Sequence, residues 1–214
     1  MYGLTLDVKH GELKIRLRKP EKEDLPELVK FFSSASIHLF TNGLFAQTIE
    51  NELEWYEKNR KDPDTCLWLI QPEGSEVPIG VTGLHGLSNM GGTCTSGIII
   101  WDKNWWKKGI ATAAHEARNW FACNWLNRFT IRSCVRVENV ASFRALQTAG
   151  YSVWGEEPVD DFRDGRWLAT YHMIYFRPST IHYMFPDGIP EKYLPGHERA
   201  IRQMALAEKE VFRP

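Results

Sequence analysis

Apolar and polar positions follow regular patterns along the first third of the chain. In "LKIRLRKP" (Leu13 to Pro20) apolar and basic residues alternate, which predicts a half-exposed strand ending at the proline. The segment "EKEDLPELVKFFSSAS" places acidic residues in a first turn, followed by apolar residues at helical spacing. After a loop at "TNGLF", Thr48 is a candidate N-cap, and "TIENELEWYEKNRKD" predicts a second helix.

The pattern then changes to short β-rich runs. "TCLWLIQPEG", "VPIGVTGLHGL" and "TCTSGIIIWD" are separated by turn residues and predict three consecutive antiparallel strands. A helix follows, with apolar residues from Ile110 to Trp125 at steps of three or four. "FTIRSCVRVEN" predicts a strand and "VASFRALQTAGY" a short helix closed by Gly150. "YSVWGEE" and "RWLATYHMIYFRP" predict two last strands, joined around "DDFRDG". This order indicates a mixed α/β (α+β) fold.

Composition changes after Pro178, where a Pro- and Gly-rich stretch leads into a last helical segment. We expect one main domain over residues 1–178 and a C-terminal extension over residues 179–214. Ala200, Met204 and Val211 fall on one side of the last helix. This side could dock on the domain or on a neighbouring subunit, so a homodimer is possible.

Charge and apolar content exclude several classes of protein. The formal net charge is −1, so no basic field favours nucleic acid as a partner. No apolar run has the length of a membrane span, and "MYGLTLDVKHGELKIRL" lacks the apolar stretch of a secretion signal. The four cysteines are widely spaced within apolar segments, away from any histidine cluster. We therefore expect buried reduced thiols, no metal site and a cytoplasmic location.

The stretch "NWWKKGIATAAHEARNWF" (Asn104 to Phe121) is the first candidate for chemistry. The first amides of a helix lack intrahelical acceptors and favour an anion, and small residues let phosphate oxygens approach them. Lys107 and Lys108 add positive charge. The stretch contains neither a P-loop motif nor a dinucleotide-binding motif. On local grounds alone, an ordinary amphipathic helix with a basic start is the better interpretation, and phosphate binding depends on the context of the stretch.

Two motifs, one at Trp106 to Ala111 and one at Asn139 and Ser142, resemble those of the GCN5-related N-acetyltransferases (GNAT), most closely the branch of ribosomal-protein N-terminal acetyltransferases. Trp106 to Ala111 resembles the family's (Gln/Arg)-x-x-Gly-x-(Gly/Ala) segment, whose first position is often Trp in this branch, with Lys107 where the branch commonly has glycine. In "ENVASFRALQTAGY", Asn139 and Ser142 match the branch's Asn-x-x-Ser motif. "DGRW" before the last strand is also typical of the branch. The resemblance covers about Leu13 to Pro178.

This resemblance implies a GNAT fold, with a mixed, mostly antiparallel sheet of about seven strands flanked by four helices and a splayed central strand pair. It implies acetyl-CoA (coenzyme A) as co-substrate and no metal. The predicted cofactor-binding residues, carried over by position, are Ile99, Ile100, Trp101, Trp106, Lys107, Lys108, Gly109, Ile110, Ala111, Thr112, Asn139, Ser142 and Arg144. Main-chain groups of the first three would bind pantetheine, the amides of residues 107–112 the pyrophosphate, and Arg144 could reach the phosphates.

Direct attack of an amine on a thioester needs a base, an oxyanion donor and an acid for the leaving thiolate. An amide around Ile100 is the candidate oxyanion donor. The tyrosine that many family members use as the acid is replaced by Leu146, so Ser142 is the candidate acid, unless it only caps a helix. Asn139 would face the thiol end of the cofactor. Glu138 is the candidate base, with Glu156, His85 or no dedicated base as alternatives.

The predicted function is an N-acetyltransferase that acts on a protein N-terminus or a small-molecule amine in a ternary complex. Family members often have an acidic residue just before the glycine of the splayed strand, where this chain has only Thr95 and Ser96. Since this acidic residue and the usual tyrosine are missing, a non-catalytic acyl-CoA-binding module is the alternative, and a self-associating structural protein is a third possibility. The acceptor would lie near the loops around residues 33 to 48 and 155 to 166. Acidic residues of the second loop could attract a cationic amine: Glu156, Glu157, Asp160, Asp161 and Asp164.

Overall fold

The structure is a computed structural model that describes residues 1–34, 38, 45–163 and 165–210, with side chains described as far as residue 205 in the last helix. The strands are β1 (Leu6–His10), β2 (Leu13–Arg18), β3 (Thr65–Pro72), β4 (Gly80–His85), β5 (Thr93–Ile100), β6 (Thr130–Arg136), β7 (Ser152–Arg163) and β8 (Arg166–Phe176). The α-helices are α1 (Leu25–Phe32), α2 (Ile49–Lys61), α3 (Ile110–Asn124), α4 (Val140–Thr148), α5 (Ile181–Met184) and α6 (Leu194–Glu210).

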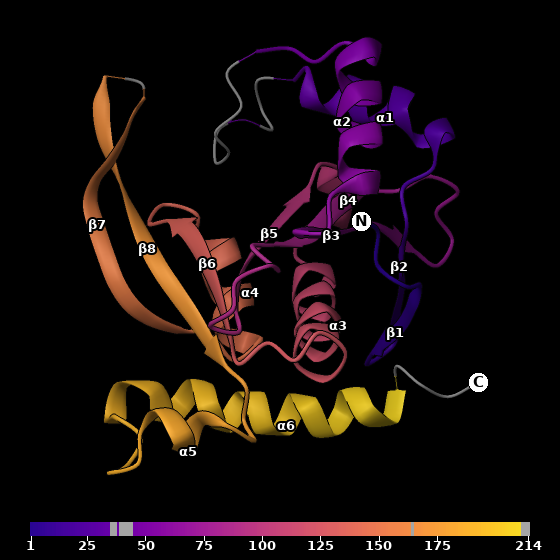
Figure 1. Cartoon of the computed structure of the whole chain (residues 1–214). Helices are drawn as coiled ribbons and strands as arrows, with labels where there is room; N and C mark the ends of the chain where they lie inside the picture. The colour runs from indigo at the N-terminus through magenta and orange to yellow at the C-terminus, as the bar shows by residue number, and fades with distance from the viewer. Residues whose placement is uncertain (35–37, 39–44, 164, 211–214) are drawn as a thin grey trace.

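The described strands form one sheet of eight strands in the order β1-β2-β3-β4-β5-β6-β8-β7 (Figure 1). All neighbouring pairs are antiparallel except β5 and β6, which α3 connects as a crossover helix. The predicted mixed sheet is confirmed, and so is the predicted order of its elements from β2 to β8. The described residues form eight strands and six α-helices, where about seven and four were predicted. The sequence interpretation missed β1, which pairs with β2 across a turn where Gly11 has φ +61°. A glycine adopts this left-handed conformation without strain.

The last hairpin is longer than predicted. "DDFR" does not form a loop, because β7 continues to Arg163, which lies opposite Arg166 of β8. Register shifts lie between Val153 and Gly155 and between Glu157 and Asp161, so the strand is irregular at these places. The β7–β8 hairpin forms an arm along one side of the molecule (Figure 1). The predicted loop residues thereby become part of a strand wall.

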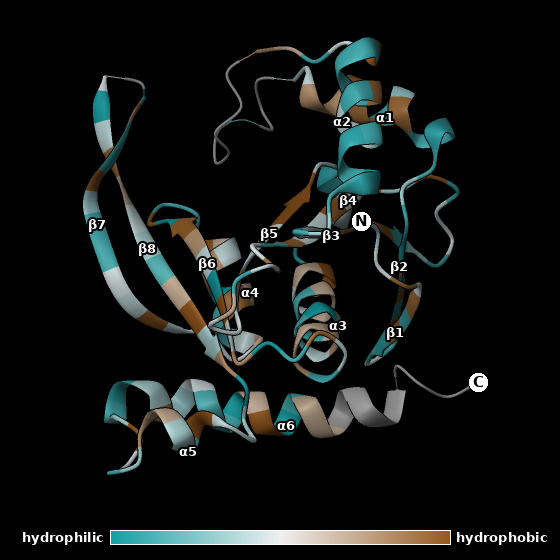
Figure 2. Cartoon of the chain, in the orientation of Figure 1, coloured by the Kyte–Doolittle hydropathy of each residue, from teal (hydrophilic) through white to brown (hydrophobic). Residues whose placement is uncertain are grey.

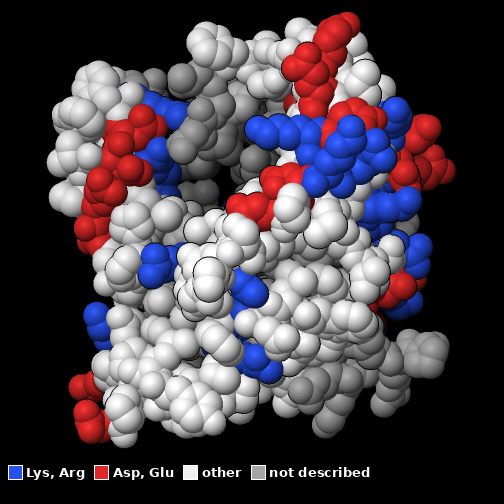
Figure 3. All heavy atoms as spheres, viewed as in Figure 1, with Lys and Arg blue, Asp and Glu red and all other residues white. Residues whose placement is uncertain are grey.

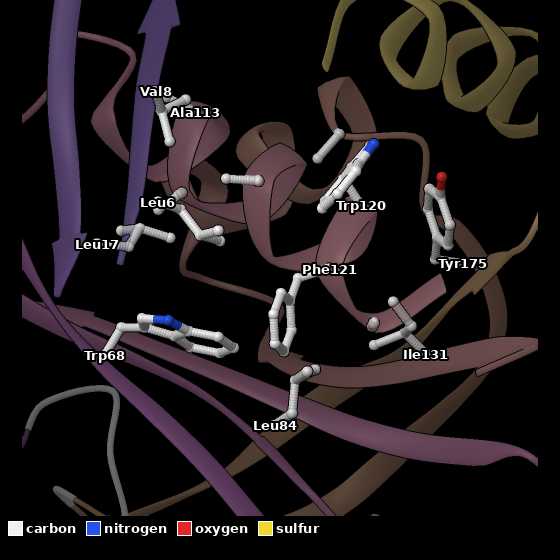
Figure 4. Close-up of a cluster of buried hydrophobic side chains, with 14 of the residues drawn as sticks. Leu6, Val8, Leu17, Trp68, Leu84, Ala113, Trp120, Phe121, Ile131 and Tyr175 are labelled. Atoms are coloured by element: carbon white, nitrogen blue, oxygen red, sulfur yellow. The ribbon is translucent and has the colours of Figure 1, made fainter. Parts of the chain in front are cut away.

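The helices cover opposite faces of the sheet. In β3, the side chains of Trp68 and Ile70 join the main core with α3, whereas Leu69 between them joins a second cluster with α1 and α2. Successive side chains of a strand point to opposite faces, so α3 and the α1–α2 pair lie on opposite sides. Trp68 meets Phe121 of α3 edge to face, with ring centroids 5.3 Å apart (Figure 4). The predicted Thr48 cap is confirmed, since its hydroxyl accepts from the Asn51 amide at 3.3 Å.

The C-terminal segment packs on the same core. Helix α6 contacts α3, α4 and β8, and Ala200 is 1% exposed within the main core (Figure 1). Met204 is partly buried against this core, and Val211 lies outside the described residues. Figure 2 shows brown, hydrophobic segments along the strands of the sheet, whereas the visible side of α2 is largely teal. Of the two docking options predicted for this helix, the one on its own chain is present. Docking of this helix on a second copy of the chain, and the domain boundary at Pro178, stay predictions.

Two further observations concern membranes and thiols. Among the described residues, no helix combines the length and apolar composition needed to cross a bilayer. The cysteines are all free. Cys66, Cys94 and Cys123 are buried, and burial raises the pKa of Cys66 to about 12 and that of Cys94 to about 11. The expectation of a buried thiol is wrong for Cys134, which is exposed.

Candidate active site

The two central strands separate part-way along their length. Pairing between β5 and β6 ends at Thr95 and Arg132. Beyond that point β5 remains paired with β4 as far as Ile100, and β6 remains paired with β8 as far as Arg136. The strands therefore splay from Gly97 onwards, as predicted. The open edges of both strands carry backbone groups that the sheet itself does not satisfy.

The alternation of hydrogen bonds decides which groups of β5 face this split. The amide of Trp101 donates to the Ile79 carbonyl at 3.0 Å, on the β4 side. In an antiparallel pair the direction alternates, so Ile99 also faces β4, whereas Ile98 and Ile100 face the split. The carbonyl of Ile100 accepts from Nε1 of Trp106 at 3.0 Å. Of the three residues predicted to bind pantetheine through their backbone, Ile100 faces the split, whereas Ile99 and Trp101 face β4. Ile98, which also faces the split, was not among the predicted residues.

The start of α3 lies just after the end of β5 in the chain. Gly109 is the N-cap with φ +83°, and its carbonyl accepts from the Ala113 amide at 3.0 Å. The amides of Ile110, Ala111 and Thr112 precede that first intrahelical bond and have no acceptor within the helix. The first turn has no acidic residue. The helix start is thus electrostatically suited to an anion.

The lysines before this helix stand beside aromatic rings. Nζ of Lys108 lies 4.9 Å from the centre of the Trp105 ring, and Nζ of Lys103 lies 5.8 Å from that of Trp106. Lys107 has φ +61°, a left-handed conformation. This explains why glycine suits the position in the family pattern, since a side chain in this region strains the backbone. The substitution keeps the amide and adds a flexible cation.

Asn139 and Ser142 follow the end of β6. The Asn139 side chain is the N-cap of α4 and accepts from the Ser142 amide at 3.1 Å. The cap is therefore Asn139, and the Ser142 hydroxyl makes no hydrogen bond within the described part of the chain. The side chain is partly exposed. This geometry removes the interpretation of Ser142 as a helix cap and leaves its hydroxyl free for a ligand.

Other predicted residues near this point differ in their surroundings. Glu138 is exposed and lies 3.7 Å from Arg166 in an ion pair. Arg144 is exposed on α4. Leu146, which was predicted to stand at the family's tyrosine position, is 1% exposed in the main core. The latter residue thus contributes packing and no proton donor.

The structure brings together three side chains that the sequence interpretation did not connect. Sγ of Cys134 lies 3.4 Å from Nδ1 of His172, and Nε2 of His172 lies 3.4 Å from a carboxylate oxygen of Glu157. Because Ile131 and Val135 point into the α3 core, Cys134 points to the opposite, open face. The three residues come from β6, β8 and β7, so only strand register could have revealed the cluster.

The acidic arm is partly neutralised. Asp160 accepts from Thr170 at 2.6 Å and also pairs with Arg136, and these contacts hold the pKa of Asp160 below its usual range. Asp161 accepts from Arg136 at 2.8 Å and from Arg163 at 2.7 Å. Glu156 is exposed, and Asp164 lies outside the described residues. The molecular surface is hollowed between this arm and the α2 side (Figure 3).

A metal centre has no ligand set in the part of the chain that the structure describes, since no group of three His, Cys, Asp or Glu side chains could hold an ion there. The geometry instead combines an anion-binding helix start, a split sheet and free hydroxyl and backbone donors beside the split.

A family model described as acetyltransferase (GNAT) domain matches residues 14–152, more than half of the chain. The chain belongs to the GNAT acetyltransferase family. This membership supports acetyl transfer to an amine in general, without a particular acceptor. The predicted family is confirmed, and the closer likeness to the ribosomal-protein branch stays a prediction.

Solved structures share this GNAT fold. Spermidine N-acetyltransferase from Vibrio cholerae, solved with CoA and spermine, has a TM-score of 0.70 and 20% identity, covering 76% of this chain and 95% of that one. A GNAT-family acetyltransferase from Bacillus anthracis has a TM-score of 0.66 and 17% identity, covering 81% and 98%. At such identities the likeness shows the fold alone. No curated protein matches the sequence.

Proposed function

We propose that the protein transfers an acetyl group from acetyl-CoA to a primary amine, on a protein N-terminus or a small molecule. Both substrates are bound together, and the neutral amine attacks the thioester directly. The observation that carries this proposal is the split between β5 and β6, which lies beside the Gly109-capped start of α3 and the Asn139–Ser142 pair.

The donor side follows from these elements. The free amides of Ile110 to Thr112 and the charges of Lys107 and Lys108 suit a pyrophosphate. Pantetheine, which carries amide groups, can add to the open edge of β5 through the Ile100 amide and the Ile98 carbonyl, as an extended peptide adds to a sheet edge. Arg144 is exposed on α4, and its guanidinium is our candidate for a further contact with the phosphates.

The chemistry needs three functions at the carbonyl. The amine nitrogen forms a bond to the carbonyl carbon, the carbon–sulfur bond breaks, and the thiolate takes a proton. The Ser142 hydroxyl, free of other hydrogen bonds among the described residues, is our choice as proton donor. Asn139 fixes the turn that presents this hydroxyl. The oxyanion needs a backbone donor on β5.

Two groups are candidates for the proton that the amine loses. Glu138 follows β6, but its carboxylate is paired with Arg166. His172 is one strand away from the split on the open face, and Glu157 is positioned to accept from its Nε2. A carboxylate only accepts, so this contact favours the tautomer with a lone pair on Nδ1. Loss of activity in His172→Gln, with Glu138→Gln active, would select His172.

The acceptor is proposed only as a chemical class, a primary amine. A polyamine is one candidate, because a spermidine N-acetyltransferase shares the fold. Asp160 and Asp161 are occupied by arginines, so the net attraction for a polycation depends chiefly on the exposed Glu156 and on Glu157. Binding of a monoamine or a protein N-terminus requires less negative charge around the acceptor site than binding of a polyamine. A panel of amines that differ in charge at equal concentration separates these classes.

The first experiment measures the melting temperature with millimolar CoA and acetyl-CoA, followed by thiol release with the amine panel. A ligand at about 100 times its Kd adds about 2.7 kcal/mol to the free energy of unfolding, so binding raises the melting temperature. No shift with either ligand would contradict the cofactor proposal. A shift without thiol release from any amine would favour the alternative, a non-catalytic acyl-CoA-binding module.

A further inference from the structure

Arg118 is a buried cation whose hydrogen-bond partners in the described part of the chain are all neutral. It lies in the middle of α3 and is 0% exposed. Its guanidinium donates to Oγ1 of Thr82 at 2.6 Å, to the Gly97 carbonyl at 2.9 Å and to Nδ1 of His115 at 2.7 Å. A buried charge is costly unless hydrogen bonds satisfy it. No carboxylate among the described residues pairs with it, so its positive field is not cancelled locally.

His115 is neutral in this arrangement. Burial, together with the charge of Arg118, lowers the pKa of His115 well below the usual value of 6.5. Arginine has no acceptor, so Nδ1 of His115 must accept and the ring proton is on Nε2. On the other side, the Tyr151 hydroxyl donates to Asn119 at 2.9 Å and lies 3.4 Å from Arg118. The guanidinium is thus held from both sides by uncharged groups.

The Gly97 carbonyl is the point where this cluster meets the split. It accepts from Arg118 and also from the Thr82 hydroxyl at 3.0 Å. Both donors lie on the β4 and α3 side. In a trans peptide the C=O and the next N–H point in opposite directions, so the Ile98 amide points away from them. The alternation along β5 gives the same result, since Ile98 faces the split.

We propose that Arg118 is a positioning residue for acetyl transfer: it fixes the Gly97–Ile98 peptide so that the Ile98 amide donates to the thioester carbonyl oxygen. The inference rests on the proposed function. Negative charge develops on this oxygen when the amine nitrogen bonds to the carbonyl carbon, and it disappears when the carbon–sulfur bond breaks and the thiolate is protonated. A cation bonded to the peptide carbonyl polarises the peptide and strengthens its N–H as a donor.

The first test uses the wild-type protein, labelled with ¹⁵N-isoleucine, with the Ile98 signal assigned through Ile98→Val. Acetyl-CoA and CoA are titrated separately. We expect the Ile98 amide proton to move downfield with acetyl-CoA and much less with CoA, which has no acyl carbonyl. Equal shifts with both ligands would overturn the assignment of Ile98 as the donor. No shift of any amide with either ligand would instead contradict the proposed function itself.

The second test compares Arg118→Met, Arg118→Lys and Thr82→Val. The readouts are the carbonyl stretch of bound [1-¹³C]acetyl-CoA, the Kd for CoA, and kcat with the best amine. In the wild type we expect the carbonyl stretch of bound acetyl-CoA to lie at lower frequency than in solution. Arg118→Met should lose this shift and about 100-fold in kcat, with the Kd for CoA changed less than about threefold. Arg118→Lys, which keeps the charge, should restore part of both.

Thr82→Val keeps the shape of its side chain and removes one of the two side-chain donors to the Gly97 carbonyl, so it serves if the arginine variants do not fold. We expect a smaller loss of kcat, about tenfold, and a partial loss of the carbonyl shift. A purely structural role of Arg118 would weaken CoA binding and kcat together and would not be rescued by lysine. An unchanged carbonyl stretch in folded Arg118 or Thr82 variants would overturn the inference.

Discussion

Lys107 occupies a backbone conformation that glycine adopts more easily. Its φ of +61° places an L-residue in the left-handed region, at a cost of about 1–2 kcal/mol. We expect Lys107→Gly to raise the free energy of unfolding by up to about 1 kcal/mol, because relief of this strain exceeds the greater flexibility of glycine in the unfolded chain. Urea unfolding measures the change.

The matched control is Lys107→Ala, which removes the same amine and keeps the strained conformation. Both variants should bind CoA more weakly than the wild type by a similar factor, since a cation near a pyrophosphate contributes about 0.3–1 kcal/mol at an exposed site. Only the glycine variant should be more stable. If both variants gain stability equally, backbone strain at this position is not the cause.

The Ser142 hydroxyl separates cofactor binding from catalysis. Its side chain takes no part in the α4 cap, so Ser142→Ala should leave the fold and the Kd for CoA almost unchanged. As proton donor to the thiolate it should contribute at least about 100-fold to kcat. Steady-state kinetics with calorimetry of CoA binding provide the measurement. Full turnover in the alanine variant would remove Ser142 from the mechanism.

Residue motifs predicted part of the candidate site. The spacing of Gly109, Asn139 and Ser142 identified the family, because local sequence determines a helix start and a cap. Ile98 and Arg118 were missed for a physical reason. An arginine is usually exposed, so sequence alone does not place the Arg118 side chain inside the core next to the apolar face of α3. Its contacts with Thr82 and Gly97 depend on how two distant segments pack.

At the scale of elements, α3 carries a neutral histidine whose burial makes stability depend on pH. The pKa of His115 is well below 6.5 in the folded protein, and it is about 6.5 in the unfolded chain. Below pH 6.5 the unfolded state therefore binds a proton that the folded state does not. This single group removes up to about 1.4 kcal/mol of stability per pH unit as the pH falls. Above pH 6.5 its contribution is constant.

The variant His115→Gln isolates this effect. A glutamine carbonyl can still accept from Arg118, but it does not titrate. Unfolding free energies measured in urea at pH 7.5 and 5.5 should fall more steeply in the wild type than in the variant. His85 and His197, whose pKa values burial also lowers, are present in both proteins and cancel in the comparison. Parallel lines for the two proteins would contradict a neutral, buried His115.

Elements with a clear periodicity were predicted well, and the errors lie where the periodicity is weak. The central strands alternate or are continuously apolar, and α3 has one apolar face, so each was found. The strand β1 is short and lies at the sheet edge. The end of β7 is largely exposed and rich in acids, a composition typical of loops, but cross-strand ion pairs such as Arg136 with Asp161 accompany the extended structure.

At the scale of the whole molecule, the two faces of the sheet have separate tasks. The face with α3 and α6 is a closed core. On the opposite face α1 and α2 pack over β3, Ile181 of α5 packs against Ile174 and Phe176 of β8, and the surface is hollowed between the β7–β8 arm and the α2 side (Figure 3). Cys134, His172 and Glu157 lie on that open side. An acceptor that enters from the open face would meet the thioester at the split while the core remains intact. The split between β5 and β6 lies in the sheet that separates the two faces.

The last helix tests how far the C-terminal segment belongs to this core. Ala200 packs on Gly150, where a Cβ atom added to the glycine would lie 3.0 Å from the Ala200 Cβ. Ala200→Asp places a carboxylate in this apolar contact and should lower the free energy of unfolding by about 3 kcal/mol or more. Ala205→Asp, an exposed position of the same helix, should change it by less than about 0.5 kcal/mol. Chemical unfolding measures both. Equal, small effects would mean that the core stands without α6 and that residues 179–214 are an appendage, whereas the expected difference makes them part of one cooperative unit.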